Sequence, residues 1–570
     1  MQTRRTFLRL SAGGALSTLW ALEGCSRFST TTVESRPTTV DGTSTSTTAA
    51  VDGETPTTDH TPPPRLRIAF ANVPTLLDPA MMSANAAIQL GFAVYEGLVR
   101  IDHELVTQPA LAERWEASDD LLTWTFTLRQ DVFFHHGTPF TARDVIYSYE
   151  RLLDPAVGSP MRAVLSAVTA VEEVDDGSVT GAVRFHLAAA NADLPLLCGT
   201  PQAFILAHDY PLESLAKLPS GTGPFRVDNA IPGRQFSLVR SEEYWAADQV
   251  TIQEVQHFYL PTFEQRAAAL DADAVDLLAD VSSEEAQLLT QNDAITIVES
   301  ASGAYLTVVM QATEAPFTDI RVRRALKLCL ARQEIQTQLL AGRGEIAWDQ
   351  PVASISPFHA NLTAYPRDIE AARQLLADAG YPNGIELDLI TADLDPGMVD
   401  LAYLVQAMAA PAGFTIRPTQ VPADVYWSSY WAQVPFHIGS WNFRTSIDET
   451  FMVAFHSHST WNESRWFNAD LDALLESARS ATDAEQRKTL YQQAQQLVME
   501  DGAVIIPCFR PVLTALHKRV SGYVPHPAGW INLRGVQMAA PAADANGMTS
   551  MAADGVDASA SADRQIKSGA

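Results

Sequence analysis

A stretch rich in tryptophan, tyrosine and phenylalanine contains the residue types best suited to binding chemistry. Aromatic side chains crowd into residues 423–467, and polar side chains alternate with several of them. An apolar cleft with a few convergent polar groups is what a small-molecule site requires. We therefore expect a ligand site formed by Trp441, Asn442, Phe443, Arg444, Asp448, Trp461 and Asn462. Packing of the same rings into a hydrophobic core is the alternative interpretation.

The sequence offers little for catalysis or metal binding. It contains no Walker A loop, no HExxH pair and no nucleophile elbow. His135 and His136 are adjacent, and adjacent residues on a strand point to opposite faces, so surface or structural roles are favoured. His456 and His458 would share one face of an extended segment, but no cysteine or nearby carboxylate completes a ligand set. We expect no catalytic residue, no metal site and no cofactor.

The beginning of the chain indicates export. Residues 1–24 start with a basic segment and continue with an uncharged stretch that is too short to span a bilayer. Arg4 and Arg5 resemble the pair in a twin-arginine export signal, and an ordinary secretory signal is the alternative. Cys25 follows this signal as the lipidated cysteine of a bacterial lipoprotein does, although Glu23 stands where a small residue is usual. A soluble protein cleaved nearby is the alternative to the lipid anchor.

Two further segments have a composition typical of disorder. Residues 25–64 consist largely of threonine, serine, proline and aspartate, which predicts a disordered tether between anchor and body. Residues 537–570 are rich in alanine, serine, aspartate and glycine and predict a disordered tail. The body between them is long enough for two or three domains.

Charge and cysteine content limit the partners and the redox chemistry. The formal net charge of −28 repels nucleic acid, so nucleic-acid binding is disfavoured. Cys198, Cys329 and Cys508 remain beside Cys25, with no CxxC spacing. One disulfide and three buried thiols are equally compatible with this pattern.

The body alternates strand-like and helix-like segments, which is the α/β pattern. Residues 123–129 alternate between apolar and polar side chains and predict a half-buried strand. Residues 368–379 carry one apolar stripe and are followed by Gly380, which predicts an amphipathic helix with a left-handed C-terminal residue. Thr482 and Glu485 have the spacing of a capping box for a helix that runs to about Met499.

Three motifs resemble those of a known family. The run Leu111–Arg151 contains Leu-Ala-Glu-x-Trp, a Thr-x-Thr-Phe-x-Leu-Arg strand and Phe-His-x-Gly-x-Pro-Phe, in that order. Gly221–Phe225, with a Glu-Tyr-Trp triplet downstream, and Pro316–Leu326 are the second and third matches. These segments are similar to those of bacterial extracellular solute-binding proteins, family 5, which includes the oligopeptide, dipeptide and nickel binders of ABC transporters. The helix at 368–380 and the run 468–507 also resemble the family, and the matches together cover nearly all of residues 65–536.

The resemblance implies an α/β, two-lobed periplasmic-binding-protein (Venus-flytrap) fold with an extra subdomain in the first lobe. Two lobes joined by crossing strands would close on a buried ligand. The expected ranges are 65–101, 221–310 and 505–536 for lobe I, 102–220 for its extra subdomain and 311–504 for lobe II.

One departure from the family pattern concerns the ligand. Peptide-binding members carry a Trp-x-x-Asp motif whose carboxylate pairs with the peptide ammonium group, but here the segment Trp441–Arg444 ends in arginine. A cation at this point would attract a carboxylate of the ligand. A salt bridge between Arg444 and a carboxylate of its own lobe is the alternative. Asp448 would take an ammonium group or cap the following helix.

The resemblance implies binding without turnover. We expect a monomeric, lipid-anchored protein in the periplasm or on the outer face of the cytoplasmic membrane. It would capture a peptide or another small solute carrying a carboxylate and deliver it to an ABC permease. An exported α/β hydrolase, or a ligand sensor or chaperone on the same fold, is the alternative. A nucleophile with its base would distinguish the hydrolase, and no such grouping is evident in the sequence.

Overall fold

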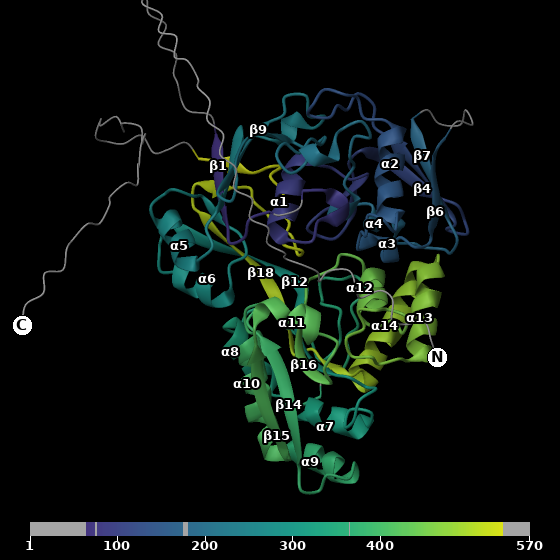
Figure 1. The fold of residues 1–570 in the computed structure, drawn as a ribbon, viewed down its shortest axis with the longest axis vertical. Coiled ribbons are helices and arrows are strands. Elements are labelled where there is room, and N and C mark those ends of the chain that lie inside the picture. The colour runs from purple at the N-terminus through teal and green to yellow at the C-terminus, as the bar shows by residue number, and fades with distance from the viewer. Residues whose placement is uncertain (1–63, 75–76, 175–180, 364, 540–570) are drawn as a thin grey trace, which may run out of the picture. The chain divides into compact units, whose positions relative to one another are not determined.

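The computed structural model describes residues 64–74, 77–174, 181–363 and 365–539, and strands alternate with helices through these ranges (Figure 1). The expected α/β class is confirmed. The expected export signal, tether and Cys25, and all but the first three residues of the expected tail, lie outside the described residues. No helix within the described ranges is long and apolar enough to cross a membrane.

One large sheet forms the frame of the molecule. Its strand order is β15-β14-β16-β12-β18-β11-β1-β10-β9-β8, with two short strands, β13 and β17, paired to β18 and β12. The bounds are β1 Arg65–Phe70, β8 Phe225–Ile231, β9 Gln235–Arg240, β10 Glu254–Tyr259, β11 Leu277–Leu278, β12 Ile295–Met310, β13 Glu345–Ile346, β14 Ile385–Ala392, β15 Phe414–Val421, β16 Phe436–Trp441, β17 Val504–Ile505 and β18 Cys508–His517.

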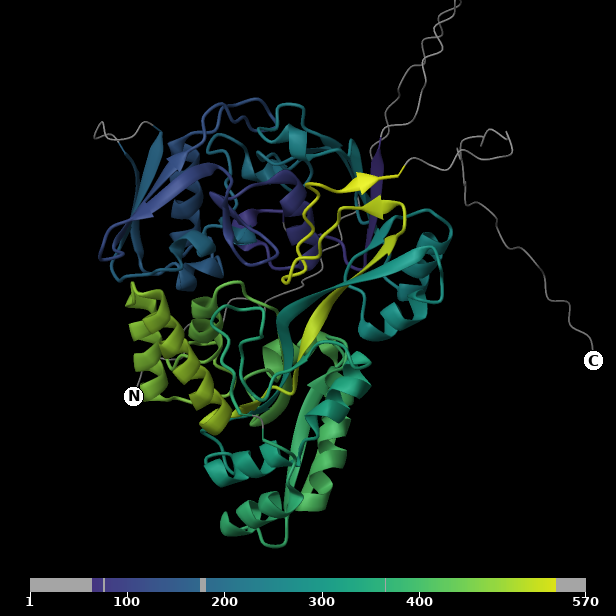
Figure 2. The same ribbon diagram turned by 180° about the vertical axis from the view of Figure 1, so that it is seen from behind.

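Strands β12 and β18 connect the two halves of this sheet. They run antiparallel, and Figure 2 shows them side by side as long teal and yellow strands. Toward one end β18 pairs with β11, which leads to β1 and β10, and toward the other β12 pairs with β16. Their register shifts between Ser300 and Ala304, where a β-bulge interrupts the ladder. The crossing strands implied by the family resemblance are therefore β12 and β18.

The helices fall into two groups according to the expected lobes. Those from the expected first lobe are α1 Asn85–Val94, α2 Ala142–Leu153, α3 Met161–Val164, α4 Leu194–Leu197, α5 Phe263–Asp271 and α6 Ser283–Leu289. Those from the expected second lobe are α7 Ile320–Cys329, α8 Arg332–Leu340, α9 Ile369–Asp378, α10 Met398–Ala409, α11 Ala423–Ser429, α12 Ile447–Ala454, α13 Ala469–Ser480 and α14 Ala484–Asp501.

A second, four-stranded antiparallel sheet has the order β4-β5-β7-β6. Its strands are β4 Ala112–Ala117, β5 Thr123–Leu128, β6 Val168–Glu173 and β7 Ala182–Leu187, and two short ribbons are β2 Val99–Ile101 with β3 Thr107–Pro109 and β19 Val520–Ser521 with β20 Gln537–Met538. The apolar face of β5 packs with α2 in a hydrophobic core of its own, which contains Phe126 and Tyr149. The four-stranded sheet and α2 fall inside the expected extra subdomain, 102–220, whose exact bounds stay a prediction.

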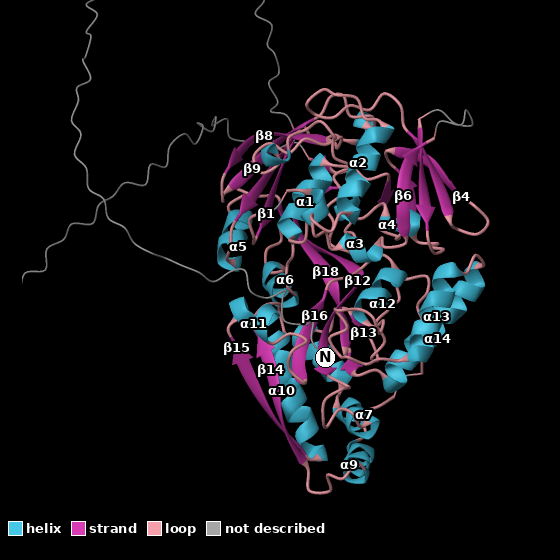
Figure 3. Cartoon of the chain, turned by 45° about the vertical axis from the view of Figure 1, so that its right-hand side comes forward, coloured by secondary structure: helices cyan, strands magenta, loops and turns pink. Residues whose placement is uncertain are grey.

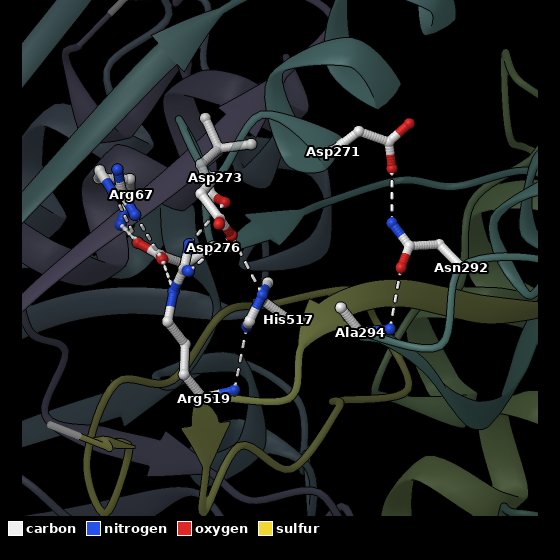
Figure 4. A network of polar contacts seen from close by, with 9 residues as sticks. Arg67, Asp271, Asp273, Asp276, Asn292, Ala294, His517 and Arg519 are labelled. Atoms are coloured by element: carbon white, nitrogen blue, oxygen red, sulfur yellow. Dashed lines mark hydrogen bonds and ion pairs between the residues drawn. The ribbon is translucent and has the colours of Figure 1, made fainter. Parts of the chain in front are cut away.

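A buried carboxylate ties the N-terminal strand to the end of β18 (Figure 4). Asp276 is fully buried and accepts two hydrogen bonds from the Arg67 guanidinium, each 2.9 Å long. Arg519 Nε lies 2.5 Å from the same carboxylate and its Nη1 lies 2.8 Å from Asp273. The two guanidinium groups compensate the charge that burial leaves on Asp276.

Several local expectations can be compared directly with the elements. The alternating residues 123–129 form β5, and the stripe at 368–379 forms α9, which Gly380 follows with a φ of +98°. The capping box at Thr482 is wrong, because the cap of α14 is Asp483, whose carboxylate accepts from the Gln486 backbone N–H. Helix α14 also runs past Met499, to Asp501.

The three cysteines within the described ranges are free, buried thiols. Of the two possibilities that the sequence left open, three buried thiols rather than one disulfide is therefore the correct one. Burial raises the pKa of each of Cys198, Cys329 and Cys508 to about 12.

Candidate functional site

The candidate site lies where two parallel strands end and their connections diverge. Strands β14, β15 and β16 run parallel, and β14 lies between the other two (Figure 3). The chain leaves β14 through α10 toward β15, then returns past β14 to β16. In open α/β sheets, ligands bind at such a switch point, outside the carboxyl ends of the strands. The residues that follow β16 are Asn442, Phe443 and Arg444, so the predicted segment occupies this edge.

Trp441 is held in place by a buried carboxylate that the sequence analysis did not identify. Glu463 is 2 % exposed and accepts hydrogen bonds from the indole N–H groups of Trp441, at 2.7 Å, and Trp431, at 2.5 Å. The Thr307 hydroxyl, from β12, donates a third bond of 2.9 Å. These three donors fix the two indoles against the end of β16 and satisfy the buried charge.

A narrow pocket, with room for about one water molecule, adjoins the Trp441 loop. Its wall combines aromatic side chains with hydroxyl groups and one guanidinium, which is the wall chemistry of a small-molecule site. The lining residues relevant here are Gly303, Tyr305, Trp441, Asn442, Phe443 and Arg444. Four of the seven predicted ligand residues therefore line one pocket, beside the bulge of β12.

Arg444 has a carboxylate partner in its own lobe. Its Nε donates to Glu449 Oε1 over 3.1 Å, and its guanidinium carbon lies 5.1 Å from the centre of the Trp441 ring. Glu449 lies in the first turn of α12. Burial raises the pKa of Glu449, and the Arg444 charge opposes this rise. The salt bridge named above as the alternative is thus present, while the guanidinium also lines the pocket.

Asp448 is placed away from the pocket wall. It is 2 % exposed and forms an ion pair with Arg479 from α13, with 3.1 Å between Nε and Oδ1. Ser446, not Asp448, caps α12, because the Ser446 hydroxyl accepts from the Glu449 backbone N–H. Burial raises the pKa of Asp448 to about 7, although Arg479 opposes the rise.

The last two predicted residues have different environments. Trp461 is half exposed, and its ring centre lies 5.4 Å from that of Trp431 and 6.4 Å from that of Trp441. Asn462 is buried and donates to the carbonyl oxygens of Phe455 and Trp466, so its amide stabilises its own loop. Neither residue is part of the pocket lining.

Two more charged residues near this edge were missed in the sequence. Arg510, on β18, donates from Nη2 to the hydroxyl of Ser440 over 3.2 Å, and Ser440 is the penultimate residue of β16. Asp395 follows the end of β14 in the loop that leads to α10. No local pattern identifies Arg510, because its partner is 70 positions away in the chain. The tryptophan cluster did carry a signal for Glu463, since buried indole N–H groups need acceptors.

The histidine pairs singled out in the sequence have ordinary polar and ring contacts. His135 is bonded to the Gly223 carbonyl, 2.9 Å away, and the rings of His456 and His458 lie 5.3 Å apart. Among the residues that the structure describes, no group of three histidine, cysteine or carboxylate side chains is arranged to hold a metal ion.

Comparisons with known proteins agree on one family of binding proteins. A profile described as bacterial extracellular solute-binding proteins, family 5 Middle, matches residues 106–463. Heme-binding protein A of Haemophilus influenzae is 28 % identical over 505 residues, covering 82 % of this chain and 91 % of the relative. Glutathione-binding protein GsiB of Pectobacterium atrosepticum is 24 % identical over 472 residues, covering 80 % and 90 %.

The fold also matches solved structures. The ABC transporter substrate-binding protein CtaP of Listeria monocytogenes superposes with a TM-score of 0.75 at 20 % identity, covering 84 % of this chain and 99 % of that one. At this identity the likeness establishes the two-lobed fold expected from the motifs.

Proposed function

Because the chain belongs to the bacterial extracellular solute-binding proteins of family 5, we propose that it captures a peptide or peptide-like solute outside the cytoplasm and delivers it to an ABC permease. It acts as a monomer, and it releases the solute chemically unchanged. Contacts that the solute makes with both lobes shift the hinge equilibrium toward the closed form, which the permease reads.

The observation that supports this function most directly is the pocket at the switch point. The Trp441 loop and the bulge of β12 form adjoining parts of its wall. A solute bound there touches a strand that connects both halves of the sheet, so binding is coupled to the geometry of the hinge. The expected ligand role of Trp441, Asn442, Phe443 and Arg444 remains part of the proposal, and so does a carboxylate on the solute.

Native mass spectrometry of protein purified without refolding tests this function. We expect a bound small molecule that dissociates intact on denaturation and rebinds on refolding with its mass unchanged. Steady turnover of any peptide or ester, above a blank prepared from a strain that lacks the protein, would contradict binding without catalysis. Folded protein that carries no bound solute after exposure to peptide mixtures would count against a peptide ligand.

We further propose that Arg4 and Arg5 direct export through the twin-arginine route and that Cys25 is lipidated. Cys25→Ala should move the protein from the membrane fraction to the soluble extracytoplasmic fraction. Replacing both arginines by lysine should leave the precursor in the cytoplasm. Normal export of the double lysine variant would show instead that the general secretory route is sufficient.

A further inference from the structure

Buried arginines in this protein have carboxylate partners. The four arginines in the buried class among the described residues each form an ion pair: Arg266 with Glu285, Arg323 with Asp501, Arg332 with Asp349 and Arg487 with Asp193. This pairing is expected, because a guanidinium removed from water is costly unless an opposite charge and hydrogen bonds replace its hydration.

Arg510, whose side chain is partly buried, has no carboxylate partner of this kind. None of the ion pairs between described residues includes it, and its single hydrogen bond runs to a neutral hydroxyl, that of Ser440. Its Nε is buried and has no hydrogen-bond partner. Burial lowers the pKa of Arg510, and the charge of Asp395 opposes this effect without forming an ion pair. The guanidinium is therefore desolvated and only partly compensated.

Arg510 keeps part of its surface exposed near the candidate site. It lies on β18 opposite Ala304, where the register of β12 shifts, and its side chain is only partly buried. Its hydroxyl partner, Ser440, immediately precedes Trp441 at the carboxyl end of β16. The unsatisfied cation thus lies at the edge of the sheet that bears the candidate site, on a strand that connects both halves of the molecule.

We infer that Arg510 is the residue that receives a carboxylate of the captured solute. This inference rests on the proposed solute-binding function and assigns its charge selectivity. A carboxylate accepts charge-assisted hydrogen bonds from a guanidinium, which would compensate the charge of Arg510. Arg444 is less suited to this role, because Glu449 already accepts a hydrogen bond from its Nε.

The first test compares peptides that differ only in the terminal charge. A library of tri- and tetrapeptides with free carboxylates and the same library as C-terminal amides are incubated with refolded protein, and complexes are quantified by native mass spectrometry. We expect the wild type to prefer the free acids and Arg510→Met to bind them at least about thirtyfold more weakly, the low end for losing one member of a buried charge pair. Arg510→Lys should retain part of the preference.

A control variant and a competing variant show whether any loss of binding is specific to Arg510. Arg417→Met removes a cation from an exposed ion pair on β15 and should bind like the wild type. If Arg510→Met keeps the preference for free acids, or Arg444→Met alone removes it, Arg510 is not the anchoring cation. Equal binding of acids and amides by the wild type would also overturn the inference, while leaving the solute-binding function intact.

A second arm does not depend on peptide binding. Melting temperatures are measured with succinate and with sodium chloride at the same ionic strength. Succinate should raise the melting temperature of the wild type and not that of Arg510→Met, and this result would support the inference even if neither library binds. Without additive, Arg510→Met should melt at or above the wild type, because it removes an unpaired, desolvated cation. A clearly lower melting temperature together with an unchanged succinate response would assign Arg510 a purely structural role.

Discussion

Two buried acids near the Trp441 loop are stabilised to different degrees. Glu463 accepts three hydrogen bonds, from two indoles and a hydroxyl, whereas Asp448 has a single arginine within ion-pair distance. Asp448 also lies near other charged groups, with Arg487 opposing and Asp193 and Glu449 reinforcing the effect of burial on its pKa. Asp448 is consequently the acid whose charge is least compensated at neutral pH.

This imbalance predicts a pH-dependent loss of stability. The pKa of Asp448 is raised from 3.8 to about 7, so between these values the unfolded chain ionises the group while the folded protein keeps the proton. The contribution of the Asp448 proton to the free energy of unfolding is complete below pH 3.8 and is lost as the pH rises through about 7. The free energy of unfolding should fall over this range by up to about 1.4 kcal/mol per pH unit. Asp448→Asn removes this titration, so its free energy of unfolding relative to wild type should increase from pH 5 to pH 7.

Urea unfolding of wild type and Asp448→Asn at several pH values measures the difference. Asp119→Asn, at an exposed turn, makes the same change in formal charge and serves as the control. Parallel pH profiles for wild type and Asp448→Asn would show that the buried carboxyl titrates alike in the folded and unfolded states.

At the scale of elements, the bulge of β12 depends on a residue without a side chain. A Cβ on Gly303 would lie 2.4 Å from Cδ2 of Phe443, which is too close for any real contact. Gly303→Ala should push the Phe443 ring into the pocket, at a cost on the order of 1–3 kcal/mol. We expect solute affinity to fall by roughly tenfold or more, measured by calorimetric titration with the co-purified solute.

A double-mutant cycle separates this clash from a general effect on the strand. Phe443→Leu is measured alone and combined with Gly303→Ala. If the clash is the cause, Gly303→Ala should change the affinity little in the Phe443→Leu background, because the ring is absent. An equal loss of affinity in both backgrounds would attribute the effect to the backbone of β12.

The elements themselves were predictable where a local pattern determines them. Residues 123–129 alternate in polarity and form β5, and the apolar stripe of α9 ends at a glycine with positive φ. The start of α14 was misplaced by one residue because Thr482 and Asp483 both suit an N-cap, and only the backbone conformation selects Asp483. A short-range pattern cannot decide between adjacent caps.

The site was only partly predictable, for a different reason. Trp441 to Arg444 stand together in sequence and line one pocket, so composition and motif were sufficient. Arg510 reaches the same edge only through the sheet, and nothing in its own segment indicates missing partners. Glu463 was missed although the indole N–H groups around it need acceptors. Asn462 shows the converse, since its amide binds backbone carbonyls of its own loop.

At the scale of the whole molecule, a buried acid links the extra subdomain to the expected second lobe. Asp193 precedes α4 and is 6 % exposed. Its Oδ2 accepts a hydrogen bond of 2.7 Å from the Ser446 hydroxyl, and its Oδ1 lies 2.6 Å from Nη2 of Arg487. These contacts join parts of the chain that the expected bounds assign to different lobes, so we expect them to contribute to the free energy of closure.

Asp193→Asn should therefore shift the hinge equilibrium away from the closed form. The substitution removes the charge that compensates Arg487 while the amide oxygen still accepts from Ser446, so the loss should fall mainly on the ion pair. We expect the co-purified solute to dissociate at least about tenfold faster, because truncating a buried charge pair acts mostly on the dissociation rate. Stopped-flow tryptophan fluorescence measures this rate, and fluorescence transfer between labels in the two lobes measures the closed fraction. Asp119→Asn again controls for net charge. If the Asp193 contacts serve only to stabilise the fold, the melting temperature should fall while the dissociation rate and the closed fraction stay at their wild-type values.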